Sequence, residues 1–253
     1  MARTRAYLAQ PHWWLEIAIV WSIFQAYSYV RNLGGKEVAP AFANGSAIED
    51  LQERLHLAIE MPVNQWVNTQ RLVADLSSVH YHTLHWWVTI GVAVWLYRTN
   101  RPAYRRASLV LAFTTLTALV GFYLIPTAPP RMYAGYHDIL AQTASWGWWE
   151  SSGSPGPESI TNQFAAMPSL HCGWAIWAGL MIAIYARRTW VRVLGVVYPL
   201  TTFFVVVGTA NHWILDIVVV AVIIAVAMVV VYRPWRQAAG AAVPEPAAER
   251  SAA

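Results

Sequence analysis

Six long apolar runs dominate this chain of 253 residues. A helix needs ~20 mainly apolar residues to cross a bilayer, and each run has roughly the length of one crossing. The composition agrees, because 57% of the residues are apolar and only 12% are charged, against about 25% charged residues in a typical soluble domain. The sequence therefore predicts an all-α membrane protein with six transmembrane helices. The runs lie at about 13–30, 79–97, 107–125, 169–186, 190–208 and 213–232.

The distribution of basic residues predicts the orientation of these helices. With the N-terminus in the cytoplasm, 12 of the 17 basic residues fall on the inner side and five on the outer side. Basic residues concentrate in cytoplasmic loops, so both termini are expected inside. A nucleic-acid surface is not favoured, because these arginines flank apolar runs and do not line one polar face. The outer residues are Arg31, Lys36, Arg54, Arg71 and Arg131.

The other segments are expected to be peripheral to the six crossings. Residues 46–68 alternate apolar and charged side chains with helical periodicity, which predicts one amphipathic helix on the extracytoplasmic surface. We interpret residues 1–236 as a single membrane domain. Residues 237–253 are rich in Ala, Pro and Glu, so we expect a disordered cytoplasmic tail. Cys172 is the only cysteine and is expected to be a small buried apolar residue.

The segment Pro126–Pro168 forms a long external connection, and long connections in compact domains are often functional. Its prolines stiffen the start and are expected to hold Arg131 at the membrane surface. Three tryptophans follow and are expected at headgroup depth, where indole rings are favoured. Residues 151–158 contain two prolines and two glycines and are a candidate lid. The tryptophans are Trp146, Trp148 and Trp149.

Two histidines lie where the fourth and sixth apolar runs begin. The 41 positions from His171 to His212 equal two membrane crossings, so both histidines are expected at the same membrane face. Asp216 follows His212 by four residues and lies on the same side of a helix. A carboxylate in that position accepts one imidazole N–H and leaves the other nitrogen to attack. The pattern predicts chemistry at this face more than packing.

Several neighbouring features predict that the histidines act on an anion. Pro168 is expected in the first turn of the fourth span, which leaves the amides of Ser169, Leu170 and His171 free. Asn211 is expected to cap the sixth span. Both helix ends then attract an anion, and Arg131 supplies the guanidinium fork that phosphoryl oxygens favour.

These motifs resemble the type 2 phosphatidic acid phosphatase superfamily, and in particular the branch that includes inositol phosphorylceramide synthase. The likeness covers about residues 80–230. It implies six spans, a phosphohistidine formed on His212, Asp216 as its orienting carboxylate, and His171 as the general acid. It further implies that Ser169 and Arg131 hold the phosphoryl oxygens and that no metal or other cofactor is needed. The strings that carry it are Ile125-Pro126-Thr127-Ala128-Pro129-Pro130-Arg131, Asn162-Gln163-Phe164-Ala165-Ala166-Met167-Pro168-Ser169-Leu170-His171 and Ala210-Asn211-His212-Trp213, with Asp216 beyond.

The chain departs from that family pattern in its cations. An arginine is expected six positions before the nucleophile, where this chain has Val206, and the only lysine, Lys36, is far upstream. Arg131 is then the one assured cation, and Arg71 or His85 would have to complete the pocket. Fewer cations fit a phosphodiester or a lipid monophosphate better than a diphosphate.

The second span carries further candidate pocket residues. Tyr81 and His85 lie one turn apart, and we expect both, together with Asn211, to contact the substrate. A metal site is not favoured here, because a histidine pair needs a third ligand and supporting groups that the sequence does not identify.

The sequence predicts a metal-independent lipid phosphoesterase that hydrolyses a lipid phosphate at the extracytoplasmic face. The alternative is a phosphotransferase that moves a phosphoryl or inositol-phosphoryl group from a phospholipid to a lipid or glycan hydroxyl. Both need the same residues and differ in the acceptor. A third reading is a non-catalytic lipid-phosphate binder or transporter, which would tolerate His212→Ala. The expected partners are the bilayer and a lipid substrate, with no nucleic acid.

Overall fold

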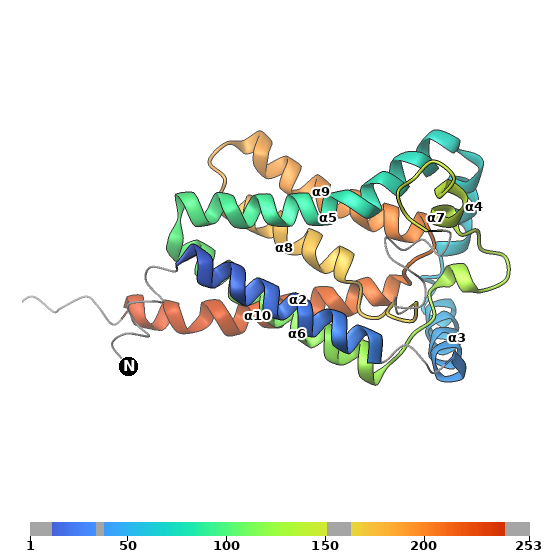
Figure 1. Ribbon diagram of the computed structural model, residues 1–253, viewed down its shortest axis with the longest axis horizontal. Coiled ribbons are helices and arrows are strands. Elements are labelled where there is room, and N and C mark those ends of the chain that lie inside the picture. The colour runs from blue at the N-terminus through green and yellow to red at the C-terminus, as the bar shows by residue number, and fades with distance from the viewer. Residues whose placement is uncertain (1–11, 34–37, 151–162, 241–253) are drawn as a thin grey trace, which may run out of the picture.

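The computed structural model describes residues 12–33, 38–150 and 163–240. Helices make up the architecture (Figure 1), and the only β feature among the described residues is an isolated bridge between Thr127 and Ala165. The all-α prediction is confirmed for this part of the chain. The candidate lid at residues 151–158 and most of the predicted tail lie outside the described residues.

Each predicted crossing coincides with a long helix, and these helices lie side by side in an elongated bundle (Figure 1). Three bounds differ from the prediction by six residues or more, and one of them is the start of α6, which begins at Arg101 rather than near residue 107. α5 begins at Arg71 rather than near residue 79, and α10 continues to Gly240, into the segment predicted to be a tail. The bundle helices are α2 (Trp13–Leu33), α5 (Arg71–Thr99), α6 (Arg101–Leu124), α8 (Leu170–Tyr185), α9 (Thr189–Gly208) and α10 (Ile214–Gly240).

Three helices of the described chain are long and apolar enough to cross a membrane. They are α6, α9 and the Ile214–Tyr232 part of α10, and α8 is a shorter apolar helix. α2 and α5 have the length, but Trp, Tyr, His and charged residues are interspersed along them. The structure therefore supports an integral membrane protein, while the count of six crossings stays a prediction.

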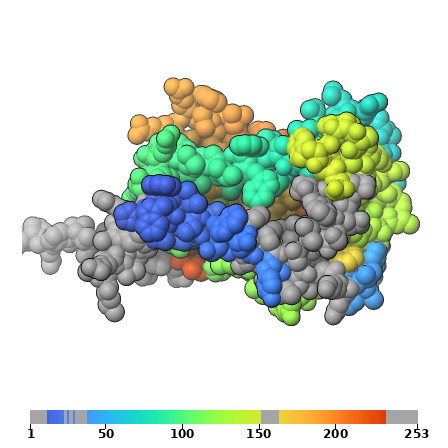
Figure 2. All heavy atoms as spheres, in the orientation of Figure 1, coloured from blue at the N-terminus to red at the C-terminus, as the bar shows by residue number. Residues whose placement is uncertain are grey.

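The bundle carries apolar side chains on its outside as well as in its core. α2 and α5 form much of the face seen in Figure 2, and Trp21, Leu72 and Trp87 on these helices are 61%, 71% and 71% exposed. The core between α5, α6 and α8 includes Leu96 and Trp177, which are fully buried. Apolar surface on this scale is typical of a surface that meets lipid or another protein.

One end of the bundle, where α8 and α10 begin and which is called the outer end here only as a label, carries α3 (Val38–Arg54), α4 (Glu60–Thr69), η1 (Pro130–Met132) and α7 (Ile139–Thr143) (Figure 1). The prediction of one amphipathic helix over residues 46–68 is wrong, because two helices are found. The break follows from His56, whose φ of 56° is left-handed. Leu57 then donates its N–H to Gln52 O at 2.8 Å and ends α3.

At the opposite end of the bundle, a largely buried ion pair joins α2 to α6. Glu16 of α2 is 8% exposed and accepts from Arg105 Nη1 at 2.9 Å and from the Tyr104 hydroxyl at 2.8 Å. The paired carboxylate attaches α2 to α6.

The predicted belt of three interfacial tryptophans is wrong for Trp149, which is buried. Its ring is 4% exposed and stacks on His82, with centroids 4.1 Å apart and planes 6° apart. Its indole N–H donates to Leu140 O at 2.8 Å. Trp146 and Trp148 are exposed, as an interfacial role requires. Trp149 instead anchors the external connection onto α5.

Candidate active site

The rings of His171 and His212 meet at the outer end of the bundle. His171 lies in the first turn of α8, and His212 lies in the short loop between α9 and α10. Their ring centroids are 6.0 Å apart and their planes differ by 53°. Reacting atoms need to approach to about 3–3.5 Å, so one phosphorus atom between the rings is within reach of both. The structure brings this pair together as the spacing predicts.

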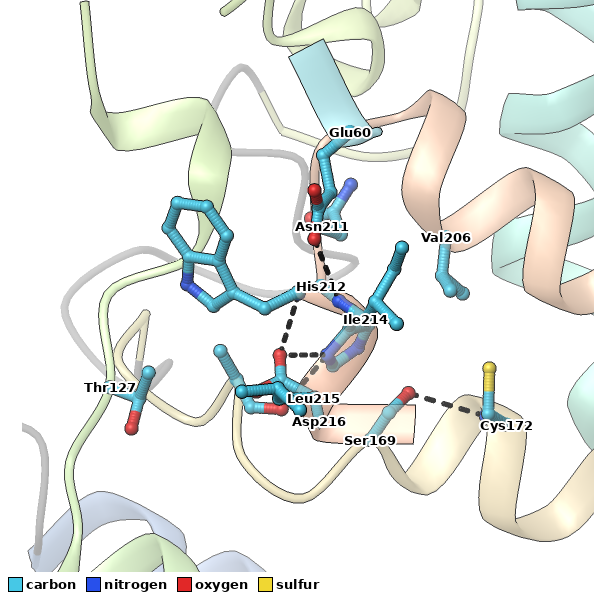
Figure 3. Close-up of polar contacts among 12 residues, drawn as sticks. Glu60, Thr127, Ser169, Cys172, Val206, Asn211, His212, Ile214, Leu215 and Asp216 are labelled. Atoms are coloured by element: carbon cyan, nitrogen blue, oxygen red, sulfur yellow. Dashed lines mark hydrogen bonds and ion pairs between the residues drawn. The ribbon is translucent and has the colours of Figure 1, made fainter. Parts of the chain in front are cut away.

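Two acceptors orient the imidazole of His212, which is 4% exposed. Nδ1 lies 2.8 Å from Ala166 O. It also lies 3.3 Å from Asp216 Oδ2 (Figure 3). Because both partners are acceptors, Nδ1 carries the proton and Nε2 keeps the lone pair. The sequence predicts the carboxylate of this pair but not the carbonyl, which is the closer partner.

Asp216 is fully buried and joins the starts of two helices. Its Oδ2 also accepts the N–H of Trp213 at 2.8 Å. Its backbone carbonyl accepts the N–H of Ser169, which precedes α8, at 3.2 Å. The same residue therefore orients His212 and fixes the spacing between α8 and α10.

The N-terminus of α10 is capped by side chains from the outer helices, not by Asn211. α10 begins at Ile214, whose N–H donates to Glu60 Oε1 at 2.8 Å (Figure 3). The next amide, of Leu215, donates to Gln52 Oε1 at 2.9 Å. The prediction that this helix end is open to a substrate anion is wrong for these amides, because the protein's own oxygen atoms occupy them. Sequence patterning gives no signal for these long-range caps.

Ser169 is the N-cap of α8. Its Oγ accepts from Cys172 N at 3.3 Å, and the residue is fully buried. The prediction that Pro168 lies in the first turn is wrong, because Pro168 precedes the cap and lies two positions before Leu170, the first residue of α8. The Ser169 amide, predicted to be free, is bonded to Asp216. The predicted contact of Ser169 with a phosphoryl oxygen stays a prediction.

Arg131 is held beside the His212 loop by every nitrogen of its guanidinium group. Nη1 donates to Asn211 Oδ1 at 2.8 Å, Nη2 to Gln163 Oε1 at 2.6 Å, and Nε lies 3.3 Å from Asp138 Oδ2. Its backbone N–H donates to Ala210 O at 2.8 Å. A guanidinium has five N–H donors, so one N–H on each Nη has no partner among the described residues.

Asn211 and Gln163 position this guanidinium group. Asn211 is 5% exposed, and its Nδ2 is bonded to the carbonyl of Thr209 at 3.1 Å. Gln163 Nε2 is buried and has no hydrogen-bond partner in the described part of the chain. Gln163 belongs to one of the strings quoted above, but its role follows only from the structure.

One of the two candidates for a second cation, Arg71, faces solvent. The Arg71 side chain is 92% exposed and lies 3.9 Å from Asp75 on its own helix, so Arg71 does not complete the pocket. Val206 is fully buried among apolar side chains.

Tyr81 and His85 both contact the ring of His171. Tyr81 stacks on it with centroids 4.1 Å apart and planes 23° apart, and His85 meets it edge-on at 4.4 Å and 61°. Both predicted pocket residues therefore lie at the site. Their contact with a substrate stays a prediction, since what the structure shows is that they flank His171.

Burial governs the electrostatics of Glu60, which is 1% exposed. Desolvation raises the pKa of its carboxyl group, and the nearby charge of Asp216 raises it further. A metal site would need several ligating side chains close together. Within the described residues, no group of three or more His, Cys, Asp or Glu side chains is arranged to hold a metal ion. Independence from metal stays a prediction.

The fold and site together define a helical membrane protein in which two neighbouring histidines, His171 and His212, lie near Arg131, a clamped arginine whose guanidinium group is held on all three nitrogens. The chain belongs to the PAP2 superfamily, whose profile matches residues 46–230, and this confirms the resemblance. It is 32% identical over 153 residues to phosphoinositol dihydroceramide synthase of Bacteroides thetaiotaomicron, covering 52% of this chain and 47% of that protein. The match thus spans about half the length of that relative. No solved structure matches the chain.

Proposed function

We propose that the protein is an integral-membrane lipid phosphoesterase that works through a phosphohistidine on His212. The observation that carries the proposal is the 6.0 Å separation of the His171 and His212 rings. Membership of the PAP2 superfamily supports a lipid phosphatase or phosphotransferase, and the apolar helices support a substrate reached from the membrane.

In the first step, the lone pair of His212 Nε2 attacks phosphorus and a P–N bond forms. The bond from phosphorus to the leaving oxygen breaks, and His171 gives its proton to that oxygen. Asp216 and Ala166 O hold the Nδ1 proton and stabilise the charge that His212 acquires.

In the second step, an acceptor hydroxyl attacks the phosphohistidine and loses its proton to His171. The P–N bond breaks, and its electron pair returns to His212 Nε2. Water as the acceptor makes the protein a lipid phosphatase. An alcohol as the acceptor makes it a phosphotransferase.

Arg131 and Gln163 are the groups best arranged to hold the phosphoryl oxygens. In the part of the chain that the structure describes, Arg131 has N–H donors left on both Nη atoms, and the buried amide nitrogen of Gln163 has no partner. A single clamped cation suits a phosphodiester or a monophosphate, which carries less charge than a diphosphate.

Two observations favour the phosphotransferase as the second candidate function. The curated relative is named as a phosphoinositol dihydroceramide synthase, which points to transfer of an inositol-phosphoryl group to a lipid hydroxyl. His212 is also 4% exposed, and a site that excludes water protects a reactive intermediate from hydrolysis.

We further propose that the site faces the extracytoplasmic side and that both termini are cytoplasmic. The excess of arginines at the opposite end of the bundle supports this orientation.

Product analysis with a phosphorus-labelled phosphatidic acid and a labelled phosphatidylinositol, with and without ceramide or a glycan acceptor, tests the two outcomes. Release of water-soluble label alone, as inorganic phosphate from phosphatidic acid or inositol phosphate from phosphatidylinositol, would eliminate the transferase. Label in the acceptor would eliminate simple hydrolysis. Turnover that persists in EDTA supports the metal-free mechanism, and His212→Ala with full cellular function would indicate a binder rather than an enzyme.

A further inference from the structure

We infer that Gln52 and Glu60 of the outer helices α3 and α4 are positioning residues for the nucleophile, because they cap the helix that follows His212. The inference rests on the proposed function, since it assigns these side chains to the placement of His212. Neither residue is a predicted site residue.

The caps occupy consecutive amides at the start of α10. Trp213 N–H is bonded to Asp216 Oδ2 at 2.8 Å, Ile214 N–H to Glu60 Oε1 at 2.8 Å and Leu215 N–H to Gln52 Oε1 at 2.9 Å. Gln52 Nε2 donates to the same Glu60 oxygen at 2.7 Å, which fixes the two caps to each other. In Figure 3, Glu60 comes down from α4 onto this helix start, next to His212.

The same helix holds the other end of the loop that carries His212. Asn64 lies one turn after Glu60 on α4, and its Nδ2 donates to Gly208 O, at the end of α9, at 2.9 Å. Its Oδ1 accepts the N–H of His137 at 2.7 Å. α4 packs closely here, because a Cβ added to Gly208 would meet Val67 Cγ2 at 2.9 Å. Both ends of the 208–214 loop are therefore fixed to α4.

The backbone of this loop needs such support. Ala210 has a φ of 55°, a left-handed conformation that is unfavourable for a residue with a Cβ. Strained residues persist where their surroundings over-determine them. Ala210 also accepts the backbone N–H of Arg131, so the strained residue lies between the nucleophile and the clamped cation.

The caps are long-range, and that is why we assign them to positioning rather than to helix stability alone. A helix start is ordinarily capped by its own Ser, Thr, Asp or Asn. Here the caps lie 154 and 163 positions away in the sequence. Gln52, Glu60 and Asn64 are each at most 1% exposed, and burying polar groups costs stability unless they are bonded. Long-range caps fix where α10 begins relative to α3 and α4.

Four substitutions separate positioning from charge. Glu60→Gln keeps the reach of Oε1 but removes the charge, whereas Glu60→Asp keeps the charge but is one methylene shorter. Glu60→Leu and Gln52→Leu remove the caps. The matched control is Glu53→Gln, which removes a charge from an exposed position next to Gln52 on α3. Short-chain phosphatidic acid and phosphatidylinositol in detergent micelles are the probes.

We expect kcat to fall about 10- to 100-fold in Glu60→Leu and Gln52→Leu, the loss typical of a displaced catalytic group, with KM within about twofold of wild type. Glu60→Gln should stay within about threefold, and Glu60→Asp should lose more than Glu60→Gln. Each kcat is divided by the folded fraction of the preparation, measured as the monodisperse fraction in size-exclusion chromatography, so misfolded protein does not count.

Three results overturn the inference while leaving the proposed function intact. They are a normalised kcat in both leucine variants equal to that of Glu53→Gln, a loss confined to KM, or Glu60→Asp more active than Glu60→Gln. Full turnover by His212→Asn, or no turnover of either probe by the wild type, instead refutes the proposed function itself.

Discussion

The imidazole rings of His171 and His212 lie 6.0 Å apart although 41 positions separate them in the sequence. α8 descends from the first and α9 returns to the second. Asp216 then links the two helix starts through its backbone carbonyl and its side chain. The separation is thus a property of the helix pair and its links.

Asp216→Asn should lower kcat about 10- to 100-fold. That loss is smaller than the about 10⁴-fold loss seen when the carboxylate of a serine-protease triad is replaced. The reason is Ala166 O, which lies closer to His212 Nδ1 than the carboxylate does, at 2.8 Å against 3.3 Å. Steady-state kinetics on purified protein checks this. An Asp216→Asn variant as inactive as His212→Asn would show that the carbonyl does not hold the tautomer.

Arg131→Lys should lower kcat/KM by about 100-fold. A lysine ammonium is a point charge and does not reproduce a planar fork, so it would not bond Asn211, Gln163 and Asp138 together. Arg71→Lys is the matched control, because that side chain is 92% exposed and should be unaffected. Equal activity of the two variants would remove Arg131 from the site.

Tyr81→Phe should keep activity within about threefold, and Tyr81→Leu should lose at least about tenfold. The ring face of Tyr81 lies 4.1 Å from the ring of His171, and aromatic faces attract cations such as a protonated imidazole. The phenyl ring retains that contact and lacks only the hydroxyl group. A large loss in Tyr81→Phe would instead favour the predicted contact between the hydroxyl and the substrate.

Glu60 should contribute a fall in thermal stability as pH rises above about 4.5, the ordinary pKa of a glutamate carboxyl group, and Glu60→Gln should remove that contribution. Burial raises the pKa of Glu60 in the folded state. Below its ordinary pKa the group is neutral in both states. As pH rises toward the raised pKa, the unfolded chain ionises first and gains stability relative to the folded one.

Melting curves of wild type and Glu60→Gln in one detergent, from about pH 4 to 8, measure this difference. Glu53→Gln serves as the control for loss of a charge. Identical pH slopes in wild type and Glu60→Gln would contradict the raised pKa.

Apolar periodicity predicted the bundle because it is a local signal. The six runs coincide with helices, and the spacing of His171 and His212 correctly placed both rings at one end. The ends of the helices were harder to predict than the helices themselves, because they depend on contacts between residues that are distant in the sequence. Asn211 has the residue type of a cap, yet its side chain bonds Arg131, and Glu60 caps α10 instead.

The outer helices show the same limit. Residues 46–68 have a helical period throughout, but the left-handed backbone at His56 divides them. That division places Gln52 and Glu60 side by side. Residue types alone do not reveal such a turn at a histidine. Trp149 likewise is of a residue type that is common at membrane interfaces, but its ring is stacked on His82 and buried.

The most direct test is to trap the intermediate. Wild-type protein is mixed with phosphorus-labelled phosphatidic acid or phosphatidylinositol, quenched in alkali within one turnover, digested and mapped. The account predicts a label that is stable in base and labile in acid, located on His212, absent from His212→Asn and formed more slowly in His171→Ala. Label on another residue, or unchanged turnover by His212→Asn, would contradict it.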